Sequence, residues 1–246
     1  MNQVRSFLVA LQFLTILPVY FKRLPDARTT GDSLVYYPLV GLIIGLLLVL
    51  VGWAGNHLPT NLCAVFILVC WVVITGALHL DGLADSADAW LGGLGDRTRT
   101  LAIMKDPACG PIAVVTLVLL LLMKFVALQQ IVFAESWLLL SMVPVLGRST
   151  LVLLFISTPY VRTNGLGSQL AEQLSQRKGM MVVLLTAFVM IALSGLSALL
   201  ILLIVVFLFY GLRSMMLKRL GGTTGDTAGA MVEISETVLL VVAAIQ

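Results

Sequence analysis

Charged side chains are scarce in this chain of 246 residues. They make up 11% of it, against about 25% in an ordinary soluble domain. Hydrophobic residues make up 60%, and the mean hydropathy is +1.07. A chain this poor in charge cannot cover a water-soluble domain with polar groups. We therefore expect residues 1–246 to form a single membrane-embedded domain.

Other missing features exclude further classes of protein. The three cysteines have neither a disulfide nor a zinc-finger spacing, and no G-K-[ST] run of a nucleotide-binding loop occurs. The net charge is only +3, and the basic residues lie near predicted helix ends, so we expect no nucleic-acid partner. The apolar runs are long and unbroken rather than short and alternating, which favours membrane helices over a membrane barrel.

Apolar runs of about 20 residues, the length that crosses a bilayer, predict an all-α polytopic bundle. We expect about six to seven transmembrane helices, at residues 35–55, 61–80, 110–132, 136–157, 179–193, 196–216 and 227–245. The run 179–216 would be about 57 Å long as one helix, so we place a break at Ser194-Gly195. Residues 4–19 are apolar but short, and basic residues flank them. They predict an interfacial or re-entrant helix.

The distribution of Lys and Arg predicts the orientation. Basic residues occur in the segments 81–109, 158–178 and 212–226, whereas the alternate connections at 56–60, 133–135 and 194–195 contain none. Cytoplasmic loops carry the excess of Lys and Arg. The three basic segments are therefore predicted to face the cytoplasm, and the chain would end on the outer side.

Three of the 12 acidic residues fall within eight positions, at the predicted inner end of the second span. Spacings of four and three place Asp81, Asp85 and Asp88 on one helix face. Carboxylates so close repel one another, and a shared hard cation, Mg²⁺ or Mn²⁺, would relieve the repulsion. The preceding His79 could orient an Asp or contact a phosphate. The alternative is a solvated helix end.

Two further segments add polar groups on the same side. Lys105 and Asp106 precede the third span, where they could meet a phosphate or simply mark the helix start. The glycine-rich run 221–229 includes Gly222 and Gly225, whose backbone N–H groups could bind an anion. Asp226 in this run is a candidate fourth metal ligand, or else only a helix cap.

Four charged residues fall inside predicted spans, where charges are costly and usually face a partner or a cavity. They are Lys124, Arg148, Glu233 and Glu236. We expect Arg148 and Glu233 to border a polar pocket, with Arg148 and Lys105 balancing a pyrophosphate. Lys124 could extend its amine to the outer surface. Simple structural pairing is the alternative.

Carboxylates with Mg²⁺, basic groups and glycine-rich amides suit phosphoryl transfer at the inner membrane surface. The spacing alone leaves alternatives open. CDP-alcohol phosphotransferases and prenyltransferases also use acidic clusters with Mg²⁺. A cation-coupled transporter would place its acids nearer the middle of the membrane.

The motifs together resemble the cobalamin synthase family, the adenosylcobinamide-GDP ribazoletransferases. The similarity extends over nearly the whole chain and rests on the runs H-L-D-G-L-A-D-x-x-D at 79–88, I-M-K-D-P-x-x-G at 103–110, G-L-G at 165–167 and G-G-T-T-G-D-T-A-G-A at 221–230. An early P-L-V-G-L-I-I-G at 38–45 fits the same pattern.

The resemblance implies a Mg²⁺-dependent enzyme of a bacterial inner membrane, late in cobalamin biosynthesis. Adenosylcobinamide-GDP and α-ribazole, or its 5′-phosphate, would give adenosylcobalamin, or its phosphate, with release of GMP. We assign Asp81, Asp85, Asp88 and Asp226 to the metal, with Asp88 as candidate general base. The sequence leaves open whether the chain assembles with copies of itself or with other enzymes of nucleotide-loop assembly.

Overall fold

The computed structural model describes residues 2–162 and 166–245, so that Gly165 of the G-L-G motif lies outside the described residues. It confirms a polytopic helical membrane protein. Within these described ranges, six helices are long and apolar enough to cross a membrane, or seven if a bent pair of helices counts as one span. One of these candidate spans joins α2 (Ala27–Ser33), a short 3₁₀ turn and α3 (Tyr37–Ala54). The others are α7 (Pro111–Phe133), α8 (Trp137–Ser157), α10 (Gln176–Ser194), α11 (Leu196–Leu220) and α12 (Gly225–Ile245).

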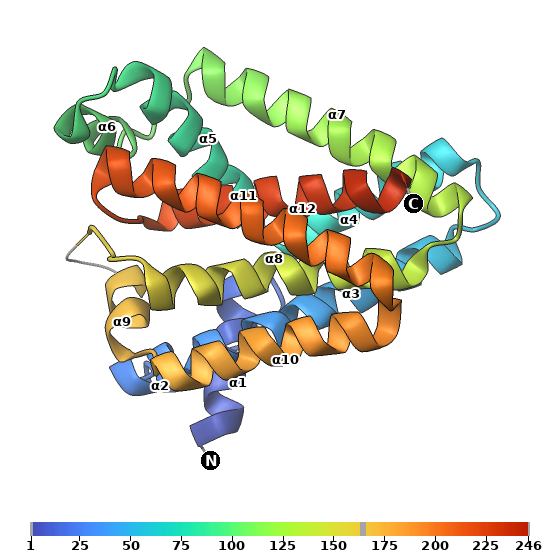
Figure 1. The fold of residues 1–246 in the computed structure, drawn as a ribbon, viewed down its shortest axis with the longest axis horizontal. Helices are drawn as coiled ribbons and strands as arrows, with labels where there is room; N and C mark the ends of the chain where they lie inside the picture. The colour runs from blue at the N-terminus through green and yellow to red at the C-terminus, as the bar shows by residue number, and fades with distance from the viewer. Residues whose placement is uncertain (1, 163–165, 246) are drawn as a thin grey trace.

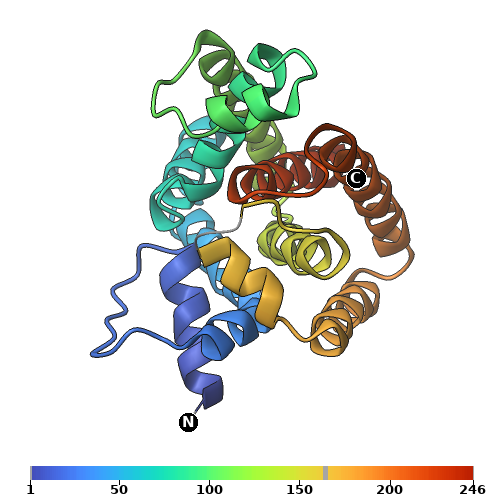
Figure 2. The ribbon, with the colours of Figure 1, turned by 90° about the vertical axis from the view of Figure 1, so that its left-hand side faces the viewer.

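Helix α8 lies in the middle of the bundle, as the end-on view shows (Figure 2). Within its candidate membrane span 83% of the residues are buried, against 11% in α10 and 17% in α11. Helix α3 packs closely on it, because Gly41 and Gly45 face the backbone of Pro144 and Ser141 without an intervening side chain. Small residues allow membrane helices to approach in this way. The core therefore sits around α8, and α10 and α11 cover it from outside.

The predicted second span, 61–80, is wrong at its inner end. Helix α4 (Thr60–Ile74) stops early, and α5 (Leu78–Gly92) continues at an angle of 85°. The Thr75 hydroxyl donates to the Trp71 carbonyl at the end of α4, and Gly76 and Ala77 both have positive φ angles, 59° and 55°. A positive φ is unfavourable for alanine and is held only by its surroundings. The acidic residues thus lie on a separate helix.

The remaining connections follow the predicted alternation. The break between α10 and α11 falls at Gly195, whose φ is 60°, as predicted. Helix α1 (Asn2–Leu14) is shorter than the predicted segment 4–19, and the short helices α6 (Arg97–Ile103) and α9 (Leu166–Gln173) lie in the basic segments. Figure 1 shows α5, α6, α9 and the α11–α12 turn at one end of the bundle, and the connections that lack Lys and Arg at the other.

Candidate active site

Helices α5 and α12 meet at small residues that are far apart in sequence. A side chain on Gly82 would come within 2.8 Å of the Asp226 carbonyl oxygen, and one on Gly229 within 3.2 Å of the His79 backbone. Only glycine permits such close contact of two helices. The predicted approach of the glycine-rich run to the acidic helix is therefore present, and it brings Asp226 beside the first turn of α5.

The start of α12 is fixed by its own threonines. The Thr224 backbone N–H donates to the Thr227 hydroxyl over 2.9 Å, and the Thr227 N–H donates to the Thr224 hydroxyl over 3.2 Å. This reciprocal arrangement satisfies N–H groups that a helix start leaves unpaired. Asp226 is consequently not the capping residue. Its carboxylate lies in the first turn of α12 and is available for another partner.

The two candidate glycines of this run differ in position. Gly222 is buried against the Pro159 carbonyl, next to the hydrogen bond from the Thr223 N–H to the same oxygen (2.8 Å). Gly222 therefore packs the turn onto the end of α8 and is badly placed to bind an anion. Gly225 is exposed and borders the cavity described below.

Three carboxylates from α5 and α12 act on one another. Burial and the charges of Asp81 and Asp226 oppose the negative charge of Asp85, Asp88 adds a smaller opposition, and Arg162 favours that charge. Arg162 forms an ion pair with Asp226 (Nη2–Oδ2 2.5 Å) and also donates to the Met104 carbonyl. Within the described ranges, the side-chain carboxylates of Asp81 and Asp85 form no hydrogen bond or ion pair. The cluster therefore carries more negative charge than Arg162 balances.

A cavity of about 160 Å³ opens beside this cluster. Its polar and small lining residues include His79, Asp81 and Gly82 of α5, Gly225 and Asp226 of α12, and Tyr160 after α8. Gly167 of α9 and Tyr37 of α3 also line it. Burial raises the pKa of the Tyr160 phenol above its ordinary value, Arg162 opposes that shift, and Asp226 reinforces it. Tyr160 thus stays protonated at neutral pH and can act as a hydrogen-bond donor in the cavity.

His79 lies at the inner wall of the same cavity. Its side chain is buried, and its Nδ1 has no hydrogen-bond partner in the described part of the chain. A buried nitrogen without a partner is costly unless a ligand or a water fills the place. This geometry fits the predicted contact of His79 with a substrate group.

Asp88 differs from the other two acids of α5. Its Oδ2 accepts from the Gly110 N–H over 2.5 Å and its Oδ1 from the Ala113 N–H over 2.9 Å. The carboxylate thus caps the start of α7, where negative charge is favourable. Both oxygens are already occupied, so Asp88 is less well placed than Asp81 or Asp85 to act as a general base or as a metal ligand.

Lys105 and Asp106 are exposed in the loop before α7. Asp106 accepts from the Ala108 N–H over 3.0 Å and so supports a local turn. Within the described part of the chain, neither side chain forms a hydrogen bond or an ion pair with the acidic cluster. Their geometry favours the alternative that they only mark the start of α7. A role for either residue in phosphate binding stays a prediction.

Arg148 is completely buried and does not border the cavity. It forms an ion pair with Glu236, and Lys124 lies 2.6 Å from Glu233 and 3.3 Å from Glu236. The Lys124 amine also lies 4.7 Å from the centre of the Trp71 ring. The expected outward extension of Lys124 is therefore wrong. Arg148 serves as a structural partner in the core rather than as an exposed phosphate ligand.

The donor set of the cluster suits a hard cation, because it consists of carboxylate oxygens without cysteine. Among residues 2–162 and 166–245, however, no three His, Cys, Asp or Glu side chains already stand in a metal-binding arrangement. The carboxylates of Asp81, Asp85 and Asp226 would therefore have to move closer together on binding. The sequence did not single out Arg162 or Tyr160 for this site, because nothing in their spacing connects a loop after α8 with α5.

Comparison with known proteins places the chain among membrane enzymes of one family. The sequence model of the family described as cobalamin-5-phosphate synthase matches residues 6–244. Similar proteins include the adenosylcobinamide-GDP ribazoletransferase of Pseudomonas fluorescens strain Pf0-1, which is 51% identical and aligned over 95% of this chain and 96% of its own length.

The corresponding protein of Pseudomonas putida strain W619 is 53% identical over 95% of this chain and 96% of its own length. That of Pseudomonas syringae pv. syringae strain B728a is 50% identical over 97% and 98%. No solved structure matches the chain. The matches extend over nearly the full length of each pair, and the family model covers residues 6–244, so the chain belongs to the cobalamin-5-phosphate synthase family.

Proposed function

We propose that this chain is an adenosylcobinamide-GDP ribazoletransferase that joins adenosylcobinamide-GDP to α-ribazole or its 5′-phosphate. The observation that carries this proposal is the identity of about half of all residues with relatives of that name, over 95% of the chain or more. The site supports it, because carboxylates, an arginine and small residues at one cavity suit a phosphate-containing substrate.

In the proposed reaction, a ribose hydroxyl of α-ribazole attacks the phosphorus that is attached to cobinamide. A new P–O bond forms, the bond to the guanylyl oxygen breaks, and GMP leaves. The hydroxyl proton needs a carboxylate acceptor. Asp85 fits that role better than Asp88, because the Asp85 carboxylate accepts no hydrogen bond within the described residues. Tyr160 and Arg162 would orient the phosphate oxygens.

We further propose that Asp81, Asp85 and Asp226 hold Mg²⁺. The cation would neutralise charge on the reacting phosphates. In its absence these carboxylates repel one another around Asp85, and a divalent cation would remove that repulsion. Asp88 would act from outside, by fixing the start of α7 next to the metal-binding helix.

The reaction test uses membranes that contain the protein, incubated with adenosylcobinamide-GDP and α-ribazole. We expect a cobalamin product and GMP in equal amounts, formation that stops with EDTA, and recovery with added Mg²⁺. A membrane fraction from cells without the gene is the control. If GMP forms without a cobalamin product, the assigned acceptor is wrong; full activity in EDTA contradicts the metal.

We also propose that the site faces the cytoplasm of a bacterial inner membrane, since the basic segments lie at its end of the bundle. Single cysteines at Thr98 and Lys218, which are both exposed, in a background without Cys63, Cys70 and Cys109, should resist an impermeant thiol reagent in intact cells. They should react in inverted vesicles. A cysteine at Asn56, in the connection between α3 and α4, is the matched control and should react from outside.

A further inference from the structure

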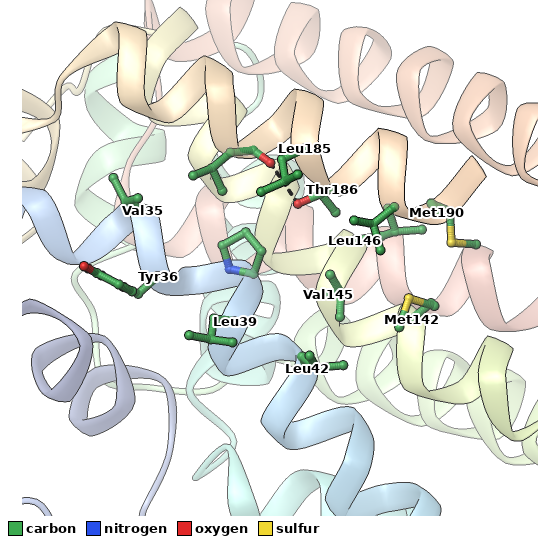
Figure 3. Close-up of a pocket in the computed structure, with 13 residues that line it drawn as sticks. Val35, Tyr36, Leu39, Leu42, Met142, Val145, Leu146, Leu185, Thr186 and Met190 are labelled. Carbon is green, nitrogen blue, oxygen red and sulfur yellow. Dashed lines mark hydrogen bonds between the residues drawn. The ribbon is translucent and has the colours of Figure 1, made fainter. Parts of the chain in front are cut away.

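An apolar groove runs between α3, α8 and α10, on the far side of α8 from the acidic site. It has a volume of about 300 Å³ and is lined almost entirely by aliphatic side chains, methionines and one tyrosine. Figure 3 shows these side chains converging from the three helices, with Tyr36 near one end and Met142 and Met190 near the other. The groove therefore follows the helices lengthwise.

The groove opens sideways, towards the surface that faces lipid. Leu39 is 46% exposed and Leu185 is 60% exposed, whereas Met190 at the deep end is 2% exposed. Its lining on α10 extends from Val182 to Met190, or about 12 Å at 1.5 Å per residue. A slot of this length, open to the bilayer and without polar partners, fits part of one acyl chain.

A small polar pocket continues the groove at the end where the basic segments lie. It shares Val35 and Tyr36 with the groove, has a volume of about 140 Å³, and adds Gln3, Ser6, Asp32 and Lys178. Asp32 and Lys178 form an ion pair across it (Oδ1–Nζ 2.8 Å), and their side chains are 27% and 55% exposed. One charge of each sign thus stands at the mouth of an apolar slot.

We propose that the groove and this pocket together bind one phospholipid with a phosphoethanolamine headgroup. Its ammonium would donate to Asp32, its phosphate would accept from Lys178, and one acyl chain would lie between α3 and α10. A purely anionic headgroup could pair its phosphate with Lys178, but it has no ammonium group to pair with the carboxylate of Asp32. A choline headgroup lacks N–H donors. The lipid would complete the packing of α10, which the protein itself buries so little.

The acyl-chain part is tested by filling the groove. Leu185→Trp blocks it, whereas Leu184→Trp changes the neighbouring residue, which is equally exposed (61%) but does not line the groove. Both proteins are purified in detergent, incubated with dioleoyl phosphatidylethanolamine and examined by native mass spectrometry. We expect one bound lipid in the wild type and in Leu184→Trp, and about tenfold weaker binding in Leu185→Trp.

Equal lipid binding by the two tryptophan variants would overturn the proposal. So would conversion of a wild-type dimer into a monomer by Leu185→Trp, because the groove would then hold a second copy of the chain. Neither outcome bears on the proposed transferase activity, which is assayed separately on the same preparations.

The headgroup part is tested by competition between lipids. The wild type should prefer phosphatidylethanolamine to phosphatidylcholine and to phosphatidylglycerol by about tenfold, the effect of one charged contact. Asp32→Asn should abolish the preference over phosphatidylglycerol. Asp96→Asn, a change of the same kind at the start of α6, is the control and should keep it. Equal affinity of the wild type for all three lipids would overturn the headgroup assignment.

Discussion

The first turn and the middle of α12 carry the same kind of side chain in opposite circumstances. Asp226 in the first turn is partly exposed and shares its surroundings with Asp81 and Asp85, while Arg162 is the basic partner of the cluster. Glu233 and Glu236, two to three turns further on, are buried and paired with Lys124 and Arg148. One helix therefore contributes to an unbalanced and to a balanced group of charges.

The comparison distinguishes charged residues that serve function, at the acidic site, from charged residues that serve structure, in the middle of the bundle. In the middle of the bundle, two basic and two acidic side chains cancel, as burial in a membrane protein requires. At the site, three carboxylates face one guanidinium, which leaves an excess of two negative charges. The divalent cation that we propose would supply the missing positive charge. Substitutions in the acidic site should therefore lower activity without lowering stability. Substitutions in the buried ion-pair group should lower stability without lowering the activity of the folded protein.

The largest effect is expected from Asp85→Asn. It removes a carboxylate that we assign to the metal and to the transferred proton, so turnover should fall by about 10³-fold or more, equivalent to ~4 kcal/mol of transition-state stabilisation. Thermal stability in detergent should not fall. The rate of cobalamin formation is the measurement, and Asp96→Asn is the control. An Asp85→Asn enzyme within about threefold of wild type would break the comparison.

Glu236→Gln should lower the stability of the protein and leave its turnover unchanged. It leaves Lys124 and Arg148 facing only Glu233 in the core, and removing one partner of a buried ion pair costs about 3–5 kcal/mol. We expect a correspondingly lower unfolding temperature, measured in detergent, with normal turnover by the protein that remains folded at low temperature. The double variant Glu236→Gln with Arg148→Met restores neutrality and should regain part of the loss. Unchanged unfolding of the single variant would contradict the structural role.

Asp88→Asn tests whether Asp88 belongs with the acidic site or with the structural charges. We expect a smaller loss of stability than in Glu236→Gln. The amide can accept one of the two backbone N–H bonds at the start of α7 but not both, so stability should fall by about 1–2 kcal/mol. Activity per folded molecule should stay within about threefold of wild type. Thermal unfolding and turnover are measured on one preparation. A loss of turnover like that of Asp85→Asn would return Asp88 to the metal.

Hydropathy and helical spacing predicted much of this structure because both are local properties of the chain. The long apolar runs gave the spans, Gly195 marked the break before α11, and the spacing of four and three placed the acids on one helix. The bend after α4 escaped prediction because the apolar run continues through Leu80. Ala77 adopts a positive φ of 55° there, which tertiary contacts impose and no residue type announces.

The sequence also could not predict which charged residues form ion pairs between distant segments. Arg162 and Asp226 lie 64 residues apart, and Lys124 and Glu233 lie 109 apart. Charge inside a span indicated that Arg148 and Lys124 needed partners, but spacing could not say whether those partners were a substrate or glutamates of α12. The same limit applies to Asp88: its periodicity is shared with Asp81 and Asp85, whereas its two N–H donors come from a helix that starts more than 20 residues later.

Direct binding of Mn²⁺, followed by electron paramagnetic resonance of the purified protein without substrates, tests the divalent site most directly. Mn²⁺ takes the same oxygen ligands as Mg²⁺ and is visible by this method. We expect affinity to fall by at least about tenfold in Asp81→Asn, Asp85→Asn and Asp226→Asn, and to stay unchanged in Asp88→Asn. Wild-type Mn²⁺ affinity in Asp85→Asn and Asp226→Asn would contradict a cation held between α5 and α12.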